Sequence, residues 1–206
     1  MTSRIRLAPP ARERRSHAER TARTRAAVMA AVVESIAEVG FQRTTAAEIA
    51  RRAGVSWGAV QHHFGGKDGC LVAVLEDSFN QFAERLSAEE IGGLGLEERV
   101  RVFVERAWEH FGGARWRSTF EILMNYPGSD TGEGRAWRSM LAAWNEVWER
   151  FFPAGQRARR EVVSLQLFTI SVLSGLASAR MLGDPTARLL DGPLALLQET
   201  LVAKLR

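Results

Sequence analysis

Apolar residues recur at spacings of three and four along most of the chain, which is the period of an α-helix with one buried face. The sequence lacks the alternation of β-branched and polar residues that marks a half-buried strand. The pattern therefore predicts an all-α fold. Nine helices are expected, over residues 19–39, 45–53, 57–64, 67 to at least 86, 97–111, 114–125, 133–152, 156–182 and 192–205.

Breaks in this pattern divide the chain into an arm and two domains. Residues 1–18 are rich in arginine and contain Pro9-Pro10, so we expect a flexible basic arm. The apolar stripe that starts near Lys67 is too long for one small domain, so its helix is expected to link two parts. A glycine-rich break follows that helix at 91–95. We therefore predict a first domain over residues 19–80 and a second over residues 81–206.

Two short helices in the first domain have the pattern of a helix-turn-helix motif, expected over residues 44–63. Thr45 and Glu48 fit a capping box at the start of the first helix. Gly54 supplies a turn with positive φ, and Ser56 caps the second helix. The outer face of the second helix is then free to enter a DNA major groove, where the Gln61 amide can pair with an adenine edge.

Positive charge is concentrated in the same part of the chain. The first 70 residues contain 12 Lys and Arg and 6 Asp and Glu, a net charge of +6, whereas the remainder carries −2. A basic segment on a nearly neutral body favours a polyanionic partner such as nucleic acid. A solvated basic tail without a partner would have the same composition.

Other features argue against several classes of protein. Cys70 is the single cysteine, which excludes an internal disulfide and a cysteine-based zinc site. The longest apolar segment, 162–179, is interrupted by Gln166 and several serines and is interpreted as a buried helix. No apolar run follows the N-terminal arginines. We find no phosphate loop or catalytic triad pattern. We therefore expect a cytoplasmic protein that is not an enzyme, needs no cofactor and does not contact a membrane.

The segment GFQRTTAAEIARRAGVSWGAVQHHFGGKDGCL, residues 40–71, resembles the DNA-binding domain of the tetracycline-repressor (TetR) family. The shared features are a glycine-aromatic pair, two threonines, an Ile-Ala pair, an Ala-Gly-Val-Ser turn and a lysine before the fourth helix. The resemblance covers residues 20 to about 85. It implies a nine-helix, two-domain fold, with an N-terminal three-helix helix-turn-helix domain and a C-terminal helical domain for ligand binding and dimerisation.

The resemblance and the motif together give the candidate DNA-binding residues. By resemblance, Thr44 and Thr45 meet the DNA backbone, and His63 and Lys67 clamp phosphates. The family commonly has a tyrosine where this chain has Gln61, which leaves the operator sequence open. The complete set is Thr44, Thr45, Ser56, Trp57, Gly58, Gln61, His62, His63 and Lys67.

Simpler interpretations compete with some of these assignments. Trp57 fits a core position as well as a DNA contact, and Lys67 fits a solvated surface charge. His62 and His63 could suggest a metal site, but adjacent residues point about 100° apart around a helix and cannot share one ion. We therefore predict no metal site.

Aromatic residues are concentrated in the first half of the second domain. They can form a packed core or, because aromatic and methionine walls are typical of ligand pockets, the cavity of a small effector. The resemblance implies an inducer pocket here. The candidate ligand-binding residues are Phe103, Trp108, Phe111, Arg117, Phe120, Glu121, Met124, Asn125 and Trp144.

The last two helices carry apolar stripes that one chain has little left to cover. Two-fold pairing into a four-helix bundle would bury both stripes and set two recognition helices one or more DNA turns apart. The candidate dimer-interface residues are Leu165, Phe168, Val172, Leu176, Leu190, Leu194, Leu197 and Leu201.

The sequence thus predicts a homodimeric transcriptional regulator that binds a pseudo-palindromic double-stranded DNA operator and responds to a small, largely apolar effector. A repressor is the first interpretation. An activator of the same family, or a ligand-binding module with a degenerate DNA-reading head, are the alternatives.

Overall fold

The computed structural model describes residues 17–125, 133–155, 157–183 and 191–206. These residues are helical with no strand, which confirms the predicted all-α fold. The helices are α1 (His17–Val39), the short 3-10 helix η1 (Phe41–Arg43), α2 (Ala46–Ala53), α3 (Trp57–Phe64), α4 (Lys67–Ser87), α5 (Leu96–Phe111), α6 (Trp116–Asn125), α7 (Glu133–Phe151), α8 (Arg159–Met181) and α9 (Asp191–Leu205).

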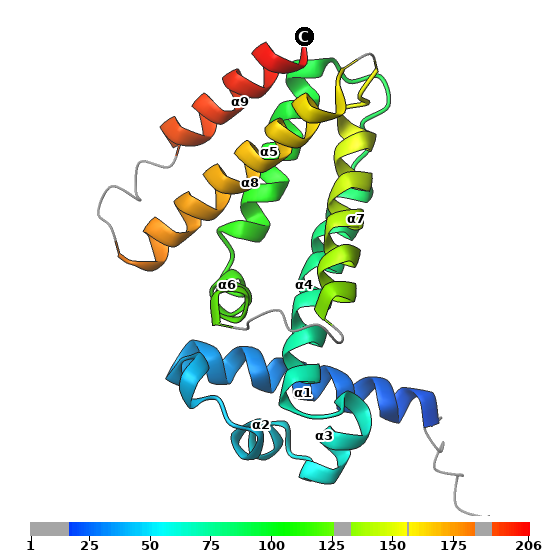
Figure 1. The fold of residues 1–206 in the computed structure, drawn as a ribbon, viewed down its shortest axis with the longest axis vertical. Helices are drawn as coiled ribbons and strands as arrows, with labels where there is room; N and C mark the ends of the chain where they lie inside the picture. Colours follow the sequence, from blue (N-terminus) through cyan, green and yellow to red (C-terminus); the bar gives the residue numbers. More distant parts are fainter. Residues whose placement is uncertain (1–16, 126–132, 156, 184–190) are drawn as a thin grey trace, which may run out of the picture.

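The helices form two groups that α4 connects (Figure 1). Helices α1, α2 and α3 pack at one end of the molecule, and α4 starts among them and runs into the second group. In that group α7 packs along α4, while α5 packs against α9 and α8. Helix α6 lies between the groups, in contact with α1, η1 and α4. The predicted basic arm, 1–18, lies almost entirely outside the described residues.

Local capping explains why the N-terminal helices begin and end where they do. Thr45 Oγ1 accepts a hydrogen bond from the Glu48 amide at 3.2 Å, and Ser56 Oγ accepts one from the Ala59 amide at the same distance. Gly54 ends α2 with a φ of 65°. In a capping box the Glu48 carboxylate would accept a hydrogen bond from the Thr45 amide. Here the Glu48 carboxylate pairs with Arg51 and Arg52 instead.

Helices α3 and α4 meet at a point where only glycine fits. A Cβ added to Gly69 would lie 1.7 Å from the carbonyl oxygen of Phe64. The missing side chain lets the start of α4 pack directly against the end of α3. This contact fixes the orientation of α3 relative to the helix that enters the second domain.

The side chains of α4 are shared between two hydrophobic cores. Leu71, Val74 and Leu75 pack with α1, α2 and α3, together with Ile122 of α6. Phe82 and Leu86 belong to the second core, which α5, α7, α8 and α9 complete. One helix therefore joins the cores of both domains, and α6 contributes to both as well.

Helix α8 is less buried than expected. Its inward face carries Gln166, Thr169, Leu173 and Ala177, so polar side chains occupy half of these positions. Within the part of the chain that the structure describes, α8 is the one helix long and apolar enough, by length and composition alone, to cross a membrane. The prediction that its apolar segment is a buried helix is wrong for a single chain, because 22% of that segment is buried.

Candidate functional site

The outer face of α3 is exposed. Val60 is fully buried and anchors the helix to the N-terminal core. Gly58, Gln61 and His62 are exposed on the other side, and 41% of Trp57 is exposed. Trp57 is therefore not a core residue. These residues form a continuous surface of indole, amide and imidazole groups on a helix short enough to fit a groove.

Gln61 is held in place by its own helix end. Its Nε2 donates a hydrogen bond to the carbonyl oxygen of Gly65 at 3.0 Å. The Gln61 amide therefore caps α3 in the free protein with one Nε2 hydrogen, which leaves the second Nε2 hydrogen and Oε1 for a base.

Thr44 does not belong to this surface. Its side chain is fully buried, and its hydroxyl lies 3.0 Å from Ser35 Oγ and donates to the Gly40 carbonyl oxygen at 3.0 Å. The prediction of a DNA contact through the Thr44 side chain is wrong, because the hydroxyl fixes the connection between α1 and α2. Thr45, next to it, is exposed at the start of α2.

His63 lies near the end of α3, and Lys67 is the first residue of α4. The Lys67 ammonium sits 5.0 Å from the centre of the Phe41 ring, in a cation–π contact with η1. His63 is half-buried, and its ring makes an edge contact with the His62 ring at 5.1 Å. No group of three His, Cys, Asp or Glu side chains that could hold a metal ion occurs among the described residues.

Arg25 of α1 contacts the end of α3, and the sequence pattern did not predict this role. Its guanidinium donates to the His63 carbonyl oxygen at 2.7 Å and stacks over the Phe64 ring at 4.4 Å. The arginine-rich composition of α1 gave no signal to single it out, because the contact joins residues 38 positions apart.

Ion pairs in the N-terminal domain join α1 to α2. Arg52 bridges Glu38 at 2.7 Å and Glu48 at 2.5 Å. Hydrogen bonds from Arg51 and Arg52 lower the pKa of Glu48 to about 2. The hydrogen bond from Arg52 also lowers the pKa of Glu38. These groups stabilise the packing of α2 against α1.

Three predicted ligand-binding residues instead hold the two domains together. Glu121 of α6 accepts a hydrogen bond from the Phe41 amide at 3.0 Å, and Arg117 braces the same carboxylate at 3.2 Å. Asn125 accepts a weak hydrogen bond from Gln42 at 3.4 Å. The structure thus places Glu121 and Asn125 in contact with η1, and the role of all three residues as polar ligand contacts stays a prediction.

A second pair of contacts from α6 strengthens this attachment. Ser118 donates to the Val33 carbonyl oxygen of α1 at 2.9 Å, and Thr119 bonds Ser78 of α4 at 3.1 Å. Both α6 side chains are buried. Helix α6 is thus hydrogen-bonded to α1, η1 and α4.

Most of the predicted aromatic ligand residues form a dense cluster. Phe103, Phe111 and Trp144 are buried in the second core, and Trp108 and Phe120 pack against it. Trp144 stacks on Phe82 with ring centres 5.6 Å apart. Met124, of which 68% is exposed, is not part of this cluster, and its role as a pocket wall stays a prediction.

The predicted dimer residues divide into exposed and buried groups. Leu197 and Leu201 are buried within their own chain, so their assignment to an interface is wrong. Leu165, Val172, Leu176 and Leu194 are partly buried, and 41% of Phe168 is exposed. Leu190 lies outside the described residues. The exposed side chains Leu167 (60%) and Leu196 (63%) are better placed for an interface.

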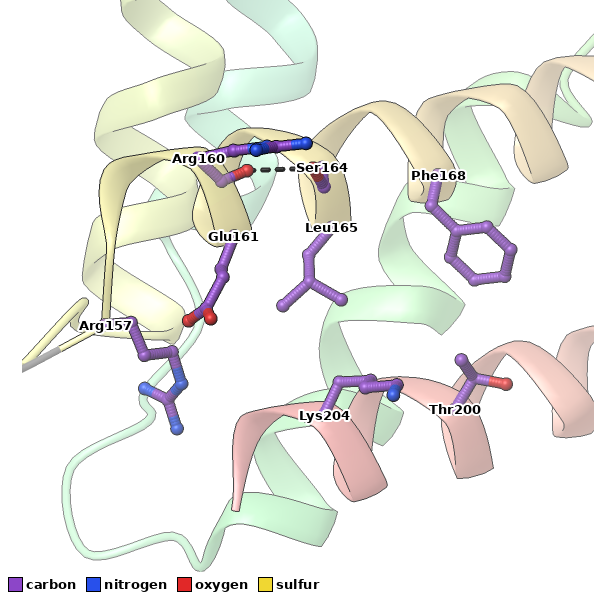
Figure 2. A pocket seen from close by; sticks show the side chains of 8 residues that line it. All are labelled: Arg157, Arg160, Glu161, Ser164, Leu165, Phe168, Thr200 and Lys204. Carbon is purple, nitrogen blue, oxygen red and sulfur yellow. Dashed lines mark hydrogen bonds between the residues drawn. The ribbon is translucent and has the colours of Figure 1, made fainter.

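An open groove of about 780 Å³ lies between α8 and α9 (Figure 2). Leu165 and Phe168 point across it toward α9, and charged side chains stand at its end. Its lining consists of Arg157, Arg160, Glu161, Ser164, Leu165, Phe168, Thr200 and Lys204. The groove continues the uncovered apolar face of α8.

Comparisons with known proteins agree with this geometry. Residues 28–74 match the family described as "Bacterial regulatory proteins, tetR family". The chain is 35% identical over 111 residues to the HTH-type transcriptional regulator BetI of Escherichia coli strains E24377A and K12. That alignment covers 47% of this chain and 55% of the relative, so the chain spans about half the length of the curated relatives it matches.

Solved structures share the whole fold. FadR from Bacillus subtilis, in complex with stearoyl-CoA, superposes with a TM-score of 0.66 at 16% identity, covering 87% of this chain and 96% of that one. A putative TetR family regulator from Vibrio parahaemolyticus gives a TM-score of 0.63 at 22% identity, covering 85% and 97%. At such identities the likeness concerns the fold. The matched proteins are regulators rather than enzymes, as the sequence predicted.

Proposed function

We propose that this chain, whose residues 28–74 match the tetR family of bacterial regulatory proteins, acts as a regulator of that kind. Two copies bind a pseudo-palindromic DNA operator through α3 and release it when a small, largely apolar effector enters the second domain. This makes the protein a cytoplasmic, ligand-responsive repressor without a membrane partner.

The exposed face of α3 is the observation that carries the proposal. Gly58 supports it further, because an added Cβ would meet only Ser56 Oγ at 3.8 Å, an ordinary contact. Since the folded chain does not require glycine there, we infer that a DNA backbone approaches this point. Trp57, Gln61 and His62 flank it and supply the base contacts.

Phosphate contacts come from the ends of the helices around α3. Thr45 and Ser56 are exposed at the starts of α2 and α3, and the half-buried His63 and Lys67 lie at the end of α3 and the start of α4. Such contacts set the register of the protein on the duplex without reading its sequence. The +6 charge of the first 70 residues supplies the long-range attraction.

A second copy of the chain is the proposed cover for α8 and α9. Leu167, Phe168 and Leu196 are large apolar side chains that water surrounds in a single chain. Pairing these helices with their two-fold equivalents buries them in a four-helix bundle. The same symmetry sets two α3 helices on one face of the DNA.

The aromatic second domain is the proposed effector site. The neighbour of the same fold that holds stearoyl-CoA supports a largely apolar ligand. Helices α4 and α6 connect this domain to the N-terminal domain. Phe82 of α4 lies in the second core, and Glu121 of α6 accepts a hydrogen bond from the Phe41 amide of η1. A ligand that favours one placement of α4 and α6 over another therefore shifts the spacing of the two α3 helices.

DNA binding measured by fluorescence anisotropy, with fragments of the chain's own upstream region over a salt series, tests the proposal. Lys67→Ala should weaken binding to all sequences alike and reduce the salt slope by about 1. Gln61→Ala should relax preference at one position in each half-site, by about 1–3 kcal/mol. Arg101→Ala, which removes an exposed charge on α5, is the matched control and should bind as the wild type does. Absence of binding by the wild type, or equal salt slopes for Lys67→Ala and Arg101→Ala, would overturn it.

A further inference from the structure

Among the described residues of the second domain, three ring nitrogens are buried without a hydrogen-bond partner in the protein: His110 Nε2, Trp116 Nε1 and Trp144 Nε1. Buried polar atoms are paired in more than about nine cases of ten, so three exceptions in one cluster require an explanation. Each unpaired group destabilises the folded chain relative to a hydrogen-bonded one.

The three rings surround one pair of phenylalanines. His110 lies 5.0 Å from Phe82, and Trp144 stacks on Phe82 at 5.6 Å. Trp116 lies 4.4 Å from Phe111 and 5.5 Å from His110. Phe82 belongs to α4, His110 and Phe111 to α5, Trp116 to α6 and Trp144 to α7. The unpaired atoms therefore lie where four helices meet.

The chemistry of these atoms limits what can satisfy them. An indole N–H can only donate, so Trp116 and Trp144 require an acceptor. Burial, together with the charges of Arg85 and Arg115, lowers the pKa of His110 to about 4, so the imidazole is neutral. A ligand with oxygen acceptors meets these requirements.

The ligand's charge follows from the surroundings. The rings in contact with His110, Trp116 and Trp144 carry no carboxylate, and the nearby arginines repel a cation. Arg115 is itself engaged by Asp77 at 3.3 Å. Arg85 and Arg115 are both exposed, so a carboxylate buried among these rings would lose its hydration without a buried cation to replace it. An uncharged acceptor, a carbonyl oxygen on an apolar body, fits best.

We propose that an uncharged, largely apolar carbonyl compound binds among α4, α5, α6 and α7, with its oxygen accepting hydrogen bonds from the Trp116 and Trp144 indoles and its body packed against Phe82 and Phe111. This inference rests on the proposed function, since it names the class of effector for the domain assigned to one.

Binding at this point favours a rearranged state of the domain. The ring centres are 4.4–6.4 Å apart in the ligand-free chain, so a ligand enters only by separating α6 or α7 from α4 and α5. The indole hydrogen bonds form only in the separated state, which gives the ligand the difference in affinity that a shift of equilibrium requires. Helix α6 transmits the change through its hydrogen bonds to α1 and η1.

Two probes of equal shape test the hydrogen bond itself. 2-Acetylnaphthalene carries a carbonyl oxygen, and 2-isopropenylnaphthalene replaces that oxygen with a methylene group. In ¹H–¹⁵N spectra of the full chain, the ketone should move the indole N–H signal of Trp116 or Trp144 downfield, whereas the alkene should not. The ketone should also bind about three- to tenfold more tightly, the value of one net hydrogen bond.

Substitutions separate hydrogen bonding from packing. Trp116→Phe and Trp144→Phe should each reduce the preference for the ketone and leave affinity for the alkene nearly unchanged. Trp148→Phe is the matched control, because Trp148 belongs to the same core but its indole nitrogen is not among the buried unpaired atoms. It should keep the ketone preference.

The inference is overturned if neither indole N–H signal shifts with the ketone, or if both probes shift the signals equally. It is also overturned if the two indole N–H groups exchange with water and respond to neither probe, because internal water alone would then satisfy them. Operator binding by the same samples is measured separately. Retained DNA binding with no ketone preference refutes the ligand class alone, whereas absent DNA binding refutes the proposed function.

Discussion

The two domains differ in how completely each pairs its buried polar groups and covers its apolar side chains. In the described part of the N-terminal domain, the buried hydroxyls of Ser35 and Thr44 bond to each other, and both helix caps are filled. Among the described residues of the second domain, four buried polar atoms lack partners within the protein, and large apolar side chains on α8 and α9 lie in water.

This difference fits the division of work that we propose for the two domains. A reading head must hold its geometry before it meets DNA, so a fully paired and tightly packed domain suits it. A sensing and pairing domain must gain something from each partner, and unpaired donors and uncovered apolar faces supply that gain. Substitutions in both domains test this contrast. The expected loss of stability is largest for a charge placed in the core and smallest for the loss of a single hydroxyl.

Leu197→Glu and Leu167→Glu separate a buried position from an open one on the last two helices. Leu197→Glu puts a charge into the core and should lower the free energy of unfolding by about 4 kcal/mol. Leu167→Glu should leave each chain folded but dissociate the dimer. Chemical denaturation and sedimentation velocity measure the two outcomes. A folded Leu167→Glu dimer would refute the proposed interface.

Gly69→Ala and Gly58→Ala compare a tight contact with an open surface in the reading head. A Cβ at Gly69 would overlap the Phe64 carbonyl, so Gly69→Ala should destabilise the chain by about 3 kcal/mol. Gly58→Ala should keep or raise the melting temperature and weaken DNA binding severalfold. Thermal melts and anisotropy report these effects. Unchanged DNA affinity in Gly58→Ala would remove the argument for close backbone approach.

His110 should make the second domain sensitive to acid. Its pKa is about 6.5 when unfolded and about 4 when folded, so the unfolded chain binds more protons between these values. Stability from this group is full above pH 6.5 and falls by up to about 3 kcal/mol as the pH drops toward 4. Denaturant titrations from pH 7 to pH 4 should show the fall in the wild type and not in His110→Phe. The same fall in both proteins would assign it to other groups.

Thr44→Val tests whether the pairing in the N-terminal domain matters for stability. The substitution removes hydrogen bonds to Ser35 and Gly40 and should lower the free energy of unfolding by about 1–2 kcal/mol. Because Thr44 is buried, the salt slope of DNA binding should be that of the wild type. A reduced slope would restore Thr44 as a phosphate contact and contradict the structure.

Sequence patterns identified features that depend on neighbouring residues. The caps at Thr45 and Ser56 and the turn at Gly54 follow from local backbone geometry, and the structure confirms all three. The α-helices of the described residues and their order were predicted for the same reason. Each signal lies within a few residues of the structure it determines.

Features that depend on distant contacts were not predictable. Glu121 bonds an amide 80 residues away, so its attachment to η1 left no local pattern. Helix α9 is apolar on most sides, so periodicity did not show that Leu197 and Leu201 face inward while Leu196 faces outward. Thr44 matched a family position, yet its burial depends on Ser35 of another helix.

Hydroxyl-radical footprinting of the wild-type chain on its own upstream DNA tests the central proposal most directly, because it reports where two copies of α3 meet one duplex. The account predicts two protected windows on one face of the DNA, centred about 10 base pairs or a multiple of that apart, and loss of both windows together in Leu167→Glu. A single window, or protection that does not depend on pairing, would contradict it.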